Sequence, residues 1–297
     1  MPRQHHAFVS TSMVVGAIVS VQVGAAIAAT MFDEVGAMGM VFLRLGLAAI
    51  ILCAWCRPTV RNRTAYDWKL TAAFGALMAL LSLASYAAVD RLPLGLVVTL
   101  ELLGPLGLAA AMSRRLWEIA WTVVALLGVF MLTDTGDSID ALGVVFALVG
   151  AASWAGYILL SAETGRRTEG LDGLALAIAA SALMVAPLGI AGGGTALLDP
   201  WILLVGTVVA LMTSVLNFAA ELAALRQITA RAFGVLMSLN PAFAALAGFV
   251  VLDQRLGGMQ IAGIALVVVA SAATVSSTDA ATDRAEASAG AVGTVPE

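Results

Sequence analysis

Charged residues are scarce in this sequence, and their scarcity argues against an ordinary soluble domain. Only 11% of the 297 residues are Asp, Glu, Lys or Arg, against about 25% in typical soluble proteins. The net charge of −4 is small, and there is no long basic run that would favour a nucleic-acid partner. The two cysteines, Cys53 and Cys56, are too few for a disulfide scaffold, and a lone CxxC lacks the further ligands of a metal site.

The usual signatures of catalysis are also missing. No glycine-rich run is followed by the Lys-Ser or Lys-Thr pair that cradles phosphate, so ATP is not the expected energy source. No metal cluster and no nucleophile–base pair stands out. We therefore expect neither an enzyme nor a cofactor.

Long apolar runs fill most of the chain instead. The residues are 61% hydrophobic and the mean hydropathy is +0.99, more than one soluble core could bury. A membrane-spanning helix needs about 20 such residues, whereas a barrel would show alternating patterns that are absent here. The sequence predicts an all-α polytopic membrane protein with ten spans, at residues 11–32, 35–56, 68–89, 93–112, 117–133, 142–162, 171–191, 201–223, 232–252 and 258–275.

The positions of the basic residues predict the orientation. If both termini lie in the cytoplasm, twelve of the 15 Lys and Arg residues face that side and two face outward, while Arg44 lies within the membrane. The first run is taken as a helix rather than a signal peptide, because it contains Gln22 and more spans follow. The expected location is the inner (cytoplasmic) membrane, with the lipid bilayer as a partner. Homodimer formation is left open.

An internal repeat divides these spans into halves. At an offset of 136 residues, 87–89 resembles 223–225 and 103–105 resembles 239–241. Five is an odd number of spans, so the second half enters the membrane from the opposite side, as in many secondary transporters. The expected organisation is a cytoplasmic N-terminal tail (1–10), a first five-helix repeat (11–133), an outer linker (134–141), a second repeat (142–276) and a disordered cytoplasmic tail (277–297).

The sequence resembles the drug/metabolite transporter superfamily with its two EamA-type repeats, and within it the threonine/homoserine exporter branch. The segments that carry the resemblance are Phe42-Leu43-Arg44-Leu45, Leu100-Glu101-Leu102-Leu103-Gly104-Pro105, Glu221-Leu222-Ala223-Ala224-Leu225 and Phe233-Gly234-Val235-Leu236-Met237-Ser238-Leu239-Asn240-Pro241. The resemblance implies export of small amino acids driven by protons. The branch often has glutamate before the last proline, where this chain has Asn240.

Two charged residues lie at similar depth within predicted spans. A charge near the membrane centre costs roughly 2.5–3.5 kcal/mol on insertion scales, so Arg44 and Glu101 need partners or water. Three interpretations are open. The two side chains form a structural ion pair, or each finds separate polar neighbours. In the third, Arg44 binds a substrate carboxylate while Glu101 binds its ammonium group or carries a coupling proton.

Other polar residues at membrane depth are further candidates for a substrate site. Gln22 and Asn240 can bind substrate or hydrogen-bond between helices, and Trp154 and Tyr157 can form an aromatic wall or pack. Glu221 lies toward the cytoplasmic end of the eighth predicted span, where it can face the cavity or the headgroups.

Two prolines occupy equivalent positions in the halves. Pro105 and Pro241 each remove a backbone donor and free a carbonyl one turn back, at Glu101 and Met237. These carbonyls either line a cavity or are satisfied within a simple kink.

The function that fits best is a secondary transporter working by alternating access, which exports small metabolites such as threonine or homoserine. A small-molecule substrate and protons are then the partners. The alternatives are an exporter of cationic drugs or another metabolite and, in a different class, a membrane sensor or membrane enzyme.

Overall fold

The computed structural model describes residues 2–61, 63–112, 116–133, 140–168, 171–217 and 236–273. Within these ranges all regular structure is helical and no strand occurs. The elements are α1 (Pro2–Ala29), α2 (Phe32–Cys56), α3 (Ala65–Val89), α4 (Leu94–Glu101), α5 (Leu103–Met112), α6 (Leu116–Thr133), α7 (Ala141–Arg167), α8 (Asp172–Gly193), η1 (Gly194–Leu198), α9 (Pro200–Ala210), η2 (Leu211–Val215), α12 (Asn240–Leu252) and a further helix, Gly258–Ala273.

Several helices have the length and composition of membrane spans. Five qualify in the described part of the chain: Ser12–Ala29, Phe32–Cys56, Ala65–Val89, Ala141–Arg167 and Asp172–Leu198. Four shorter apolar helices accompany them: Leu94–Leu108, Pro200–Val215, Asn240–Leu252 and Gly258–Ala273. Large apolar side chains remain exposed on these helices, among them Ile50, Leu183 and Val250. Such exposure is costly in water and normal against lipid, so the chain is a multi-pass helical membrane protein, as its composition predicted.

Local sequence explains where the helices begin. The Thr64 hydroxyl accepts a hydrogen bond from the Asp67 amide, and the Asp67 carboxylate accepts one from the Thr64 amide. This capping box satisfies two otherwise free donors at the start of α3. Asp140 caps α7 and Asp199 caps α9 without such a box, each side chain accepting hydrogen bonds from two backbone amides. The Gly143 and Leu142 amides and the Arg91 guanidinium hold the pKa of Asp140 below its usual value.

Several predicted spans are not regular helices. The segment 93–112 is interrupted at Leu102, between α4 and α5, three residues before Pro105. Proline has no N–H to bond the Glu101 carbonyl, which removes one α-helical hydrogen bond at this point. The segment 201–223 contains a π-helical turn, η2, that follows α9 directly. Single π-turns within helices are uncommon and often lie at functional sites.

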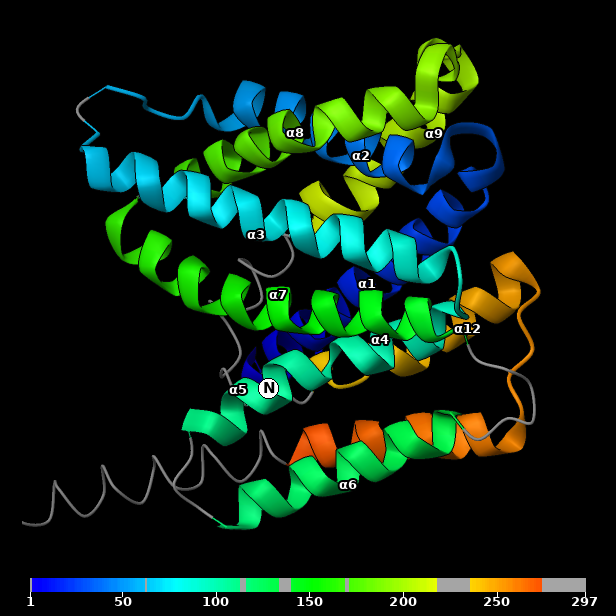
Figure 1. Cartoon of the computed structure of the whole chain (residues 1–297). Coiled ribbons are helices and arrows are strands. Elements are labelled where there is room, and N and C mark those ends of the chain that lie inside the picture. The colour runs from blue at the N-terminus through cyan, green and yellow to red at the C-terminus, as the bar shows by residue number, and fades with distance from the viewer. Residues whose placement is uncertain are drawn as a thin grey trace, which may run out of the picture.

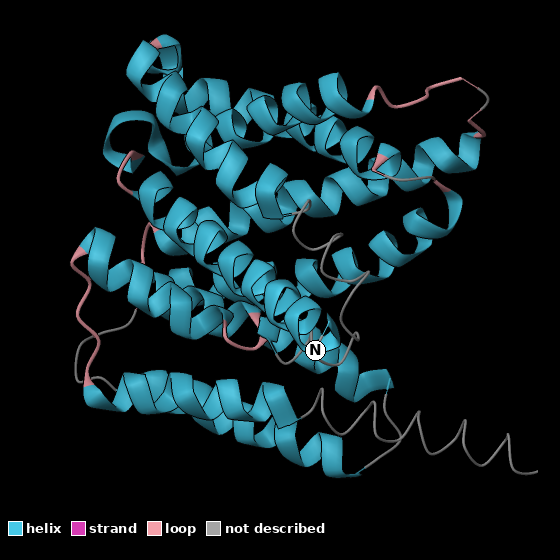
Figure 2. Cartoon of the chain, turned by 180° about the vertical axis from the view of Figure 1, so that it is seen from behind, coloured by secondary structure: helices cyan, strands magenta, loops and turns pink. Residues whose placement is uncertain are grey.

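The helices pack as a bundle whose members run roughly alongside one another (Figure 1). α2 packs on α8 and α3 packs on α7, while α4 lies against α12. α6 and the helix Gly258–Ala273 lie side by side at one edge of the bundle in both views (Figure 2). Gly104 lets α5 approach α7, because a Cβ there would overlap the Ala151 carbonyl. The interior enclosed by these contacts contains the polar residues described next.

A central polar cavity as the candidate binding site

A cavity of about 300 Å³ lies in the interior of the bundle. Its wall is drawn from α1, α2, α3, α4, α7, α8, α12 and the η2 region, and most of it is apolar. The side chains that bring polar atoms to it are Gln22, Arg44, Ser82, Ser85, Tyr86, Glu101, Trp154, Tyr157, Thr213, Ser214, Asn217 and Asn240. Six of the seven residues that the sequence marked as binding candidates therefore meet in one place. The seventh, Glu221, lies outside the described residues.

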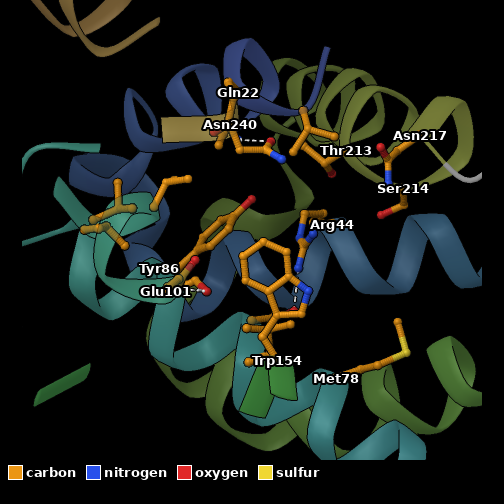
Figure 3. Close-up of a pocket in the computed structure, with 18 of the residues that line it drawn as sticks. Gln22, Arg44, Met78, Tyr86, Glu101, Trp154, Thr213, Ser214, Asn217 and Asn240 are labelled. Atoms are coloured by element: carbon orange, nitrogen blue, oxygen red, sulfur yellow. Dashed lines mark hydrogen bonds between the residues drawn. The ribbon is translucent and has the colours of Figure 1, made fainter. Parts of the chain in front are cut away.

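The two intramembrane charges are held by two hydroxyls of α3. Arg44 donates a hydrogen bond from Nη2 to the Ser82 hydroxyl, and the Ser85 hydroxyl donates to Oε1 of Glu101. Ser82 and Ser85 lie three residues apart, hence on one face of the helix. Within the described ranges no ion pair joins Arg44 to Glu101. The structure thus has the arrangement with separate polar neighbours, and leaves both charges directed at the same cavity (Figure 3).

An aromatic ring lies beneath the arginine. The Arg44 Cζ atom is 5.2 Å from the centroid of the Tyr86 ring, within the range of a cation–π contact. The Tyr86 ring also contacts Phe32, with centroids 5.6 Å apart. Two polar atoms in this contact have no hydrogen-bond partner among the described residues, namely Nε of Arg44 and the hydroxyl of Tyr86.

Amide side chains form an uncharged part of the wall. Gln22 on α1 donates from Nε2 to Oδ1 of Asn240 on α12, at 3.0 Å, across 218 residues of sequence. Asn240 in turn donates from Nδ2 to the Met237 carbonyl at 2.8 Å. That carbonyl is the one freed by Pro241, so the side chain of Asn240 replaces the lost backbone donor. The interhelical hydrogen bond given above as one alternative is present, and both side chains also line the cavity, while substrate binding by them stays a prediction.

Aromatic and hydroxyl side chains complete the wall. Trp154 and Tyr157 both project from α7 to the cavity, and the Tyr157 ring contacts Phe74 with centroids 5.3 Å apart. From the η2 region, Thr213, Ser214 and Asn217 also reach it.

Contacts with α1 anchor the π-turn of η2. The Ser20 hydroxyl donates to the Met212 carbonyl at 3.0 Å. Gly24 of α1 faces Thr213 so closely that a Cβ at this position would lie 2.8 Å from the threonine methyl.

The sequence did not single out Ser82, Ser85, Tyr86, Thr213 or Ser214. Hydroxyl groups are common in membrane helices, where they often bond the carbonyl four residues earlier, so one alone carries little information. A usable signal was present in the spacing, because residues at i, i+3 and i+4 share a helix face. Ser82, Ser85 and Tyr86 have this spacing within an otherwise apolar span.

A cavity with intramembrane charges, enclosed by apolar helices, is the kind of site that membrane transporters use. Residues 141–276 match the EamA-like transporter family. The threonine/homoserine exporter RhtA of Salmonella typhimurium (strain LT2) is 36% identical over 259 residues, which cover 86% of this chain and 87% of the relative. RhtA of Escherichia coli (strain K12) is 34% identical over the same lengths.

This chain belongs to the EamA-like transporter family of the drug/metabolite transporter superfamily, as the sequence indicated, and it falls with the RhtA branch. One solved crystal structure of a protein covers 90% of this chain and 98% of its own, with a TM-score of 0.49 and 16% identity. That likeness is too weak to add to the assignment.

Proposed function

We propose that this chain is a secondary active transporter that exports small amino acids, such as threonine or homoserine, across the inner (cytoplasmic) membrane. The observation that carries the proposal is the presence of Arg44 and Glu101 in one cavity, each held by its own serine. An amino acid brings one carboxylate and one ammonium group, so it offers a counter-charge to each side chain. Two relatives that cover most of the chain are named threonine/homoserine exporters.

The size of the cavity favours small cargo over bulky drugs. Its volume of about 300 Å³ corresponds to roughly ten water molecules at ~30 Å³ each. Sites for small molecules usually span about 300–1,000 Å³, so this one lies at the lower end. A small amino acid fits such a space, whereas a large hydrophobic cation needs it to expand. The drug-exporter alternative is therefore less favoured by the structure.

Pairs of helix contacts support two halves related by a twofold exchange. If α1, α2, α3 and α4 are exchanged with α7, α8, α9 and α12, the observed contacts map onto one another. α3 on α8 has its counterpart in α2 on α9, and α1 on α12 has its counterpart in α4 on α7. α2 on α8 and α4 on α12 map onto themselves. This pattern supports inverted repeats at 11–133 and 142–276, and with them alternating access around a shared site.

The cavity wall follows the same 136-residue offset. Five pairs of lining residues have this spacing: Ile18 and Trp154, Val21 and Tyr157, Met78 and Ser214, Leu81 and Asn217, and Glu101 and Met237. In every pair one member is aliphatic or Met while the other is polar, aromatic or charged. A symmetric scaffold thus surrounds an asymmetric site, which is what one oriented substrate requires.

Ion pairs at opposite ends of α3 and α7 support the proposed orientation. Arg167 lies 3.6 Å from Asp67 at one end, and Arg91 lies 2.9 Å from Asp140 at the other. Of the basic loop residues that the structure describes, Arg57, Arg61 and Arg63 also lie at the first end, and such residues favour the cytoplasm. We therefore place ten spans in the membrane with both termini in the cytoplasm.

A sensor or an enzyme has less support. In the described part of the chain no three His, Cys, Asp or Glu side chains gather as metal ligands. The buried charges lie within a cavity at membrane depth rather than at one interface, where a soluble substrate would be processed. Family membership also points to transport.

Transport by purified protein in liposomes tests the proposal directly. With an acidic interior, protons leave as substrate enters, and we expect labelled threonine or homoserine to accumulate by up to about tenfold per pH unit for each coupled proton. Protein-free liposomes and liposomes without a pH gradient are the controls. Failure to move any amino acid in a broad panel would contradict the proposal.

A small substitution beside Glu101 gives a further prediction. A Cβ on Gly150 of α7 would lie 2.6 Å from Oε1 of Glu101, so Gly150→Ala displaces the carboxylate from the Ser85 hydroxyl. We expect amino-acid transport to fall about tenfold, as for the loss of one hydrogen bond to a charged group. The melting temperature should change little, because only the end of a side chain moves.

The matched control is Gly107→Ala on α5, where a Cβ meets nothing within 4 Å. Equal transport by the two alanine variants would show that the position of the Glu101 carboxylate has no bearing on transport.

A further inference from the structure

Four buried side-chain atoms lack a hydrogen-bond partner among the described residues. They are Nε of Arg44, the hydroxyl of Tyr86, the hydroxyl of Thr164 and the hydroxyl of Ser181. Of the four residues, Arg44 and Tyr86 line the central cavity and the other two do not. A buried polar atom without a partner destabilises the fold. Its presence at a cavity wall points to a ligand that supplies the missing bond.

The geometry of the two residues makes them one unit. The Arg44 guanidinium stacks over the Tyr86 ring, with Cζ 5.2 Å from its centroid. Nη2 of Arg44 donates to the Ser82 hydroxyl, and the Tyr86 ring also contacts Phe32. Both side chains are therefore fixed by neighbours, while one polar atom of each is left over. Tyr86 is only 7% exposed, so bulk water does not serve its hydroxyl.

The chemistry of these atoms selects the ligand. Nε of arginine is a donor and cannot accept, and the tyrosine hydroxyl can donate. Two donors on stacked side chains suit a group that only accepts and has two oxygens, and a carboxylate has both properties. Glu101 is not that group here, since it is held by Ser85 and forms no ion pair with Arg44.

We propose that Arg44 Nε and the Tyr86 hydroxyl together bind the carboxylate of the cargo, which makes Tyr86 a specificity-determining residue. This inference rests on the proposed function, because it concerns the same cavity. The Tyr86 hydroxyl is an uncharged donor. It therefore favours cargo with a carboxylate without changing the net charge that Arg44 and Glu101 give the cavity. Cargo with a neutral acceptor in place of the carboxylate gains less from Tyr86, and cargo with no acceptor there gains nothing.

The variant Tyr86→Phe tests this role. Phenylalanine keeps the ring that packs on Arg44 and Phe32 and removes only an unpartnered hydroxyl, so the fold is retained. Binding to purified protein is measured with L-threonine and with L-threoninol, which has a hydroxymethyl group in place of the carboxylate. We expect Y86F to weaken threonine binding about 10- to 100-fold and to weaken threoninol binding much less, because a neutral hydroxyl accepts a weaker hydrogen bond than a carboxylate does.

Tyr66→Phe is the matched control. Tyr66 is exposed and stacks under Arg167, away from the cavity, so Y66F retains the wild-type preference for threonine over threoninol. Unchanged threonine binding by Y86F, or equal losses for both compounds, would overturn the proposal.

A second probe separates this inference from the proposed function. If the wild type neither binds nor transports threonine, the proposed cargo is wrong, and acetate then tests the carboxylate subsite alone. Thermal stabilisation of the wild type by acetate, measured against chloride at equal ionic strength, should be lost in Y86F. An identical response of both proteins to acetate would refute the subsite whatever the cargo is.

Discussion

Arg44→Gln is expected to reduce the export of amino acids by at least about a hundredfold in kcat/KM. Hydrogen bonds to charged groups each contribute about 1.5–3 kcal/mol, and 1.4 kcal/mol corresponds to a factor of ten. Glutamine fills part of the space and keeps one N–H at about the position of Nε, but it removes the positive charge and the terminal Nη2 that donates to the Ser82 hydroxyl. Export of threonine from cells, and its uptake by liposomes, are the measurements.

The same variant separates the two kinds of cargo. A cation without a carboxylate has no use for Arg44, and its transport is expected to persist or improve in R44Q because a repulsive charge is gone. Arg91→Gln is a suitable control, since it makes the same substitution at an arginine outside the cavity, in a partly exposed ion pair with Asp140. Full threonine transport by R44Q would exclude Arg44 as the carboxylate site.

The sequence predicted where apolar helices occur better than it predicted the irregular turns within them. Apolar runs of about 20 residues are a strong signal, because a bilayer accepts little else. A helix break at Pro105 was predicted, and the chain is interrupted three residues earlier, at Leu102, whereas the π-turn at Leu211–Val215 was not predicted. Proline at position 105 gave a local reason for the first. The second has no marker in residue type, since its backbone is stabilised by a distant contact, the hydroxyl of Ser20 on the Met212 carbonyl.

The sequence could indicate single candidate residues of the site, but not which side chains contact one another. Arg44 and Glu101 stand out because charges are expensive in a membrane. Sequence alone could not choose between an ion pair and separate partners, because the answer depends on which helix lies between them. That helix is α3, whose serines bind one charge each. Likewise, nothing in the chain relates Gln22 to Asn240 until α1 and α12 pack together.

The inverted repeat that we propose accounts for an asymmetric site. Equivalent positions of the two halves reach the same cavity, so one half can carry a polar group where the other carries an aliphatic one. Glu101 and its counterpart Met237 both line the cavity in this way. Only one half has a glutamate four residues before its proline, so Glu101 is the single carboxylate among the cavity-lining residues that the structure describes. Any proton coupling by a carboxylate of this lining therefore depends on Glu101.

Glu101→Gln is therefore expected to abolish accumulation of substrate driven by a pH gradient. Glutamine has nearly the same shape and its carbonyl oxygen can still accept from the Ser85 hydroxyl, so the cavity should keep its form. What it cannot do is take up or release a proton. In liposomes with an acidic interior, the wild type accumulates threonine, while E101Q only equilibrates it, a loss of about tenfold per pH unit for one coupled proton.

Exchange of labelled for unlabelled threonine, without any gradient, distinguishes the two roles left open for Glu101. If the carboxylate carries the coupling proton, E101Q still exchanges substrate, because binding and reorientation need no net proton movement. If it binds the ammonium group, exchange falls together with accumulation, because the cation loses its counter-charge in a wall that is otherwise mostly apolar. Accumulation by E101Q at the wild-type level would exclude both roles, since no other carboxylate lines the cavity among the residues the structure describes.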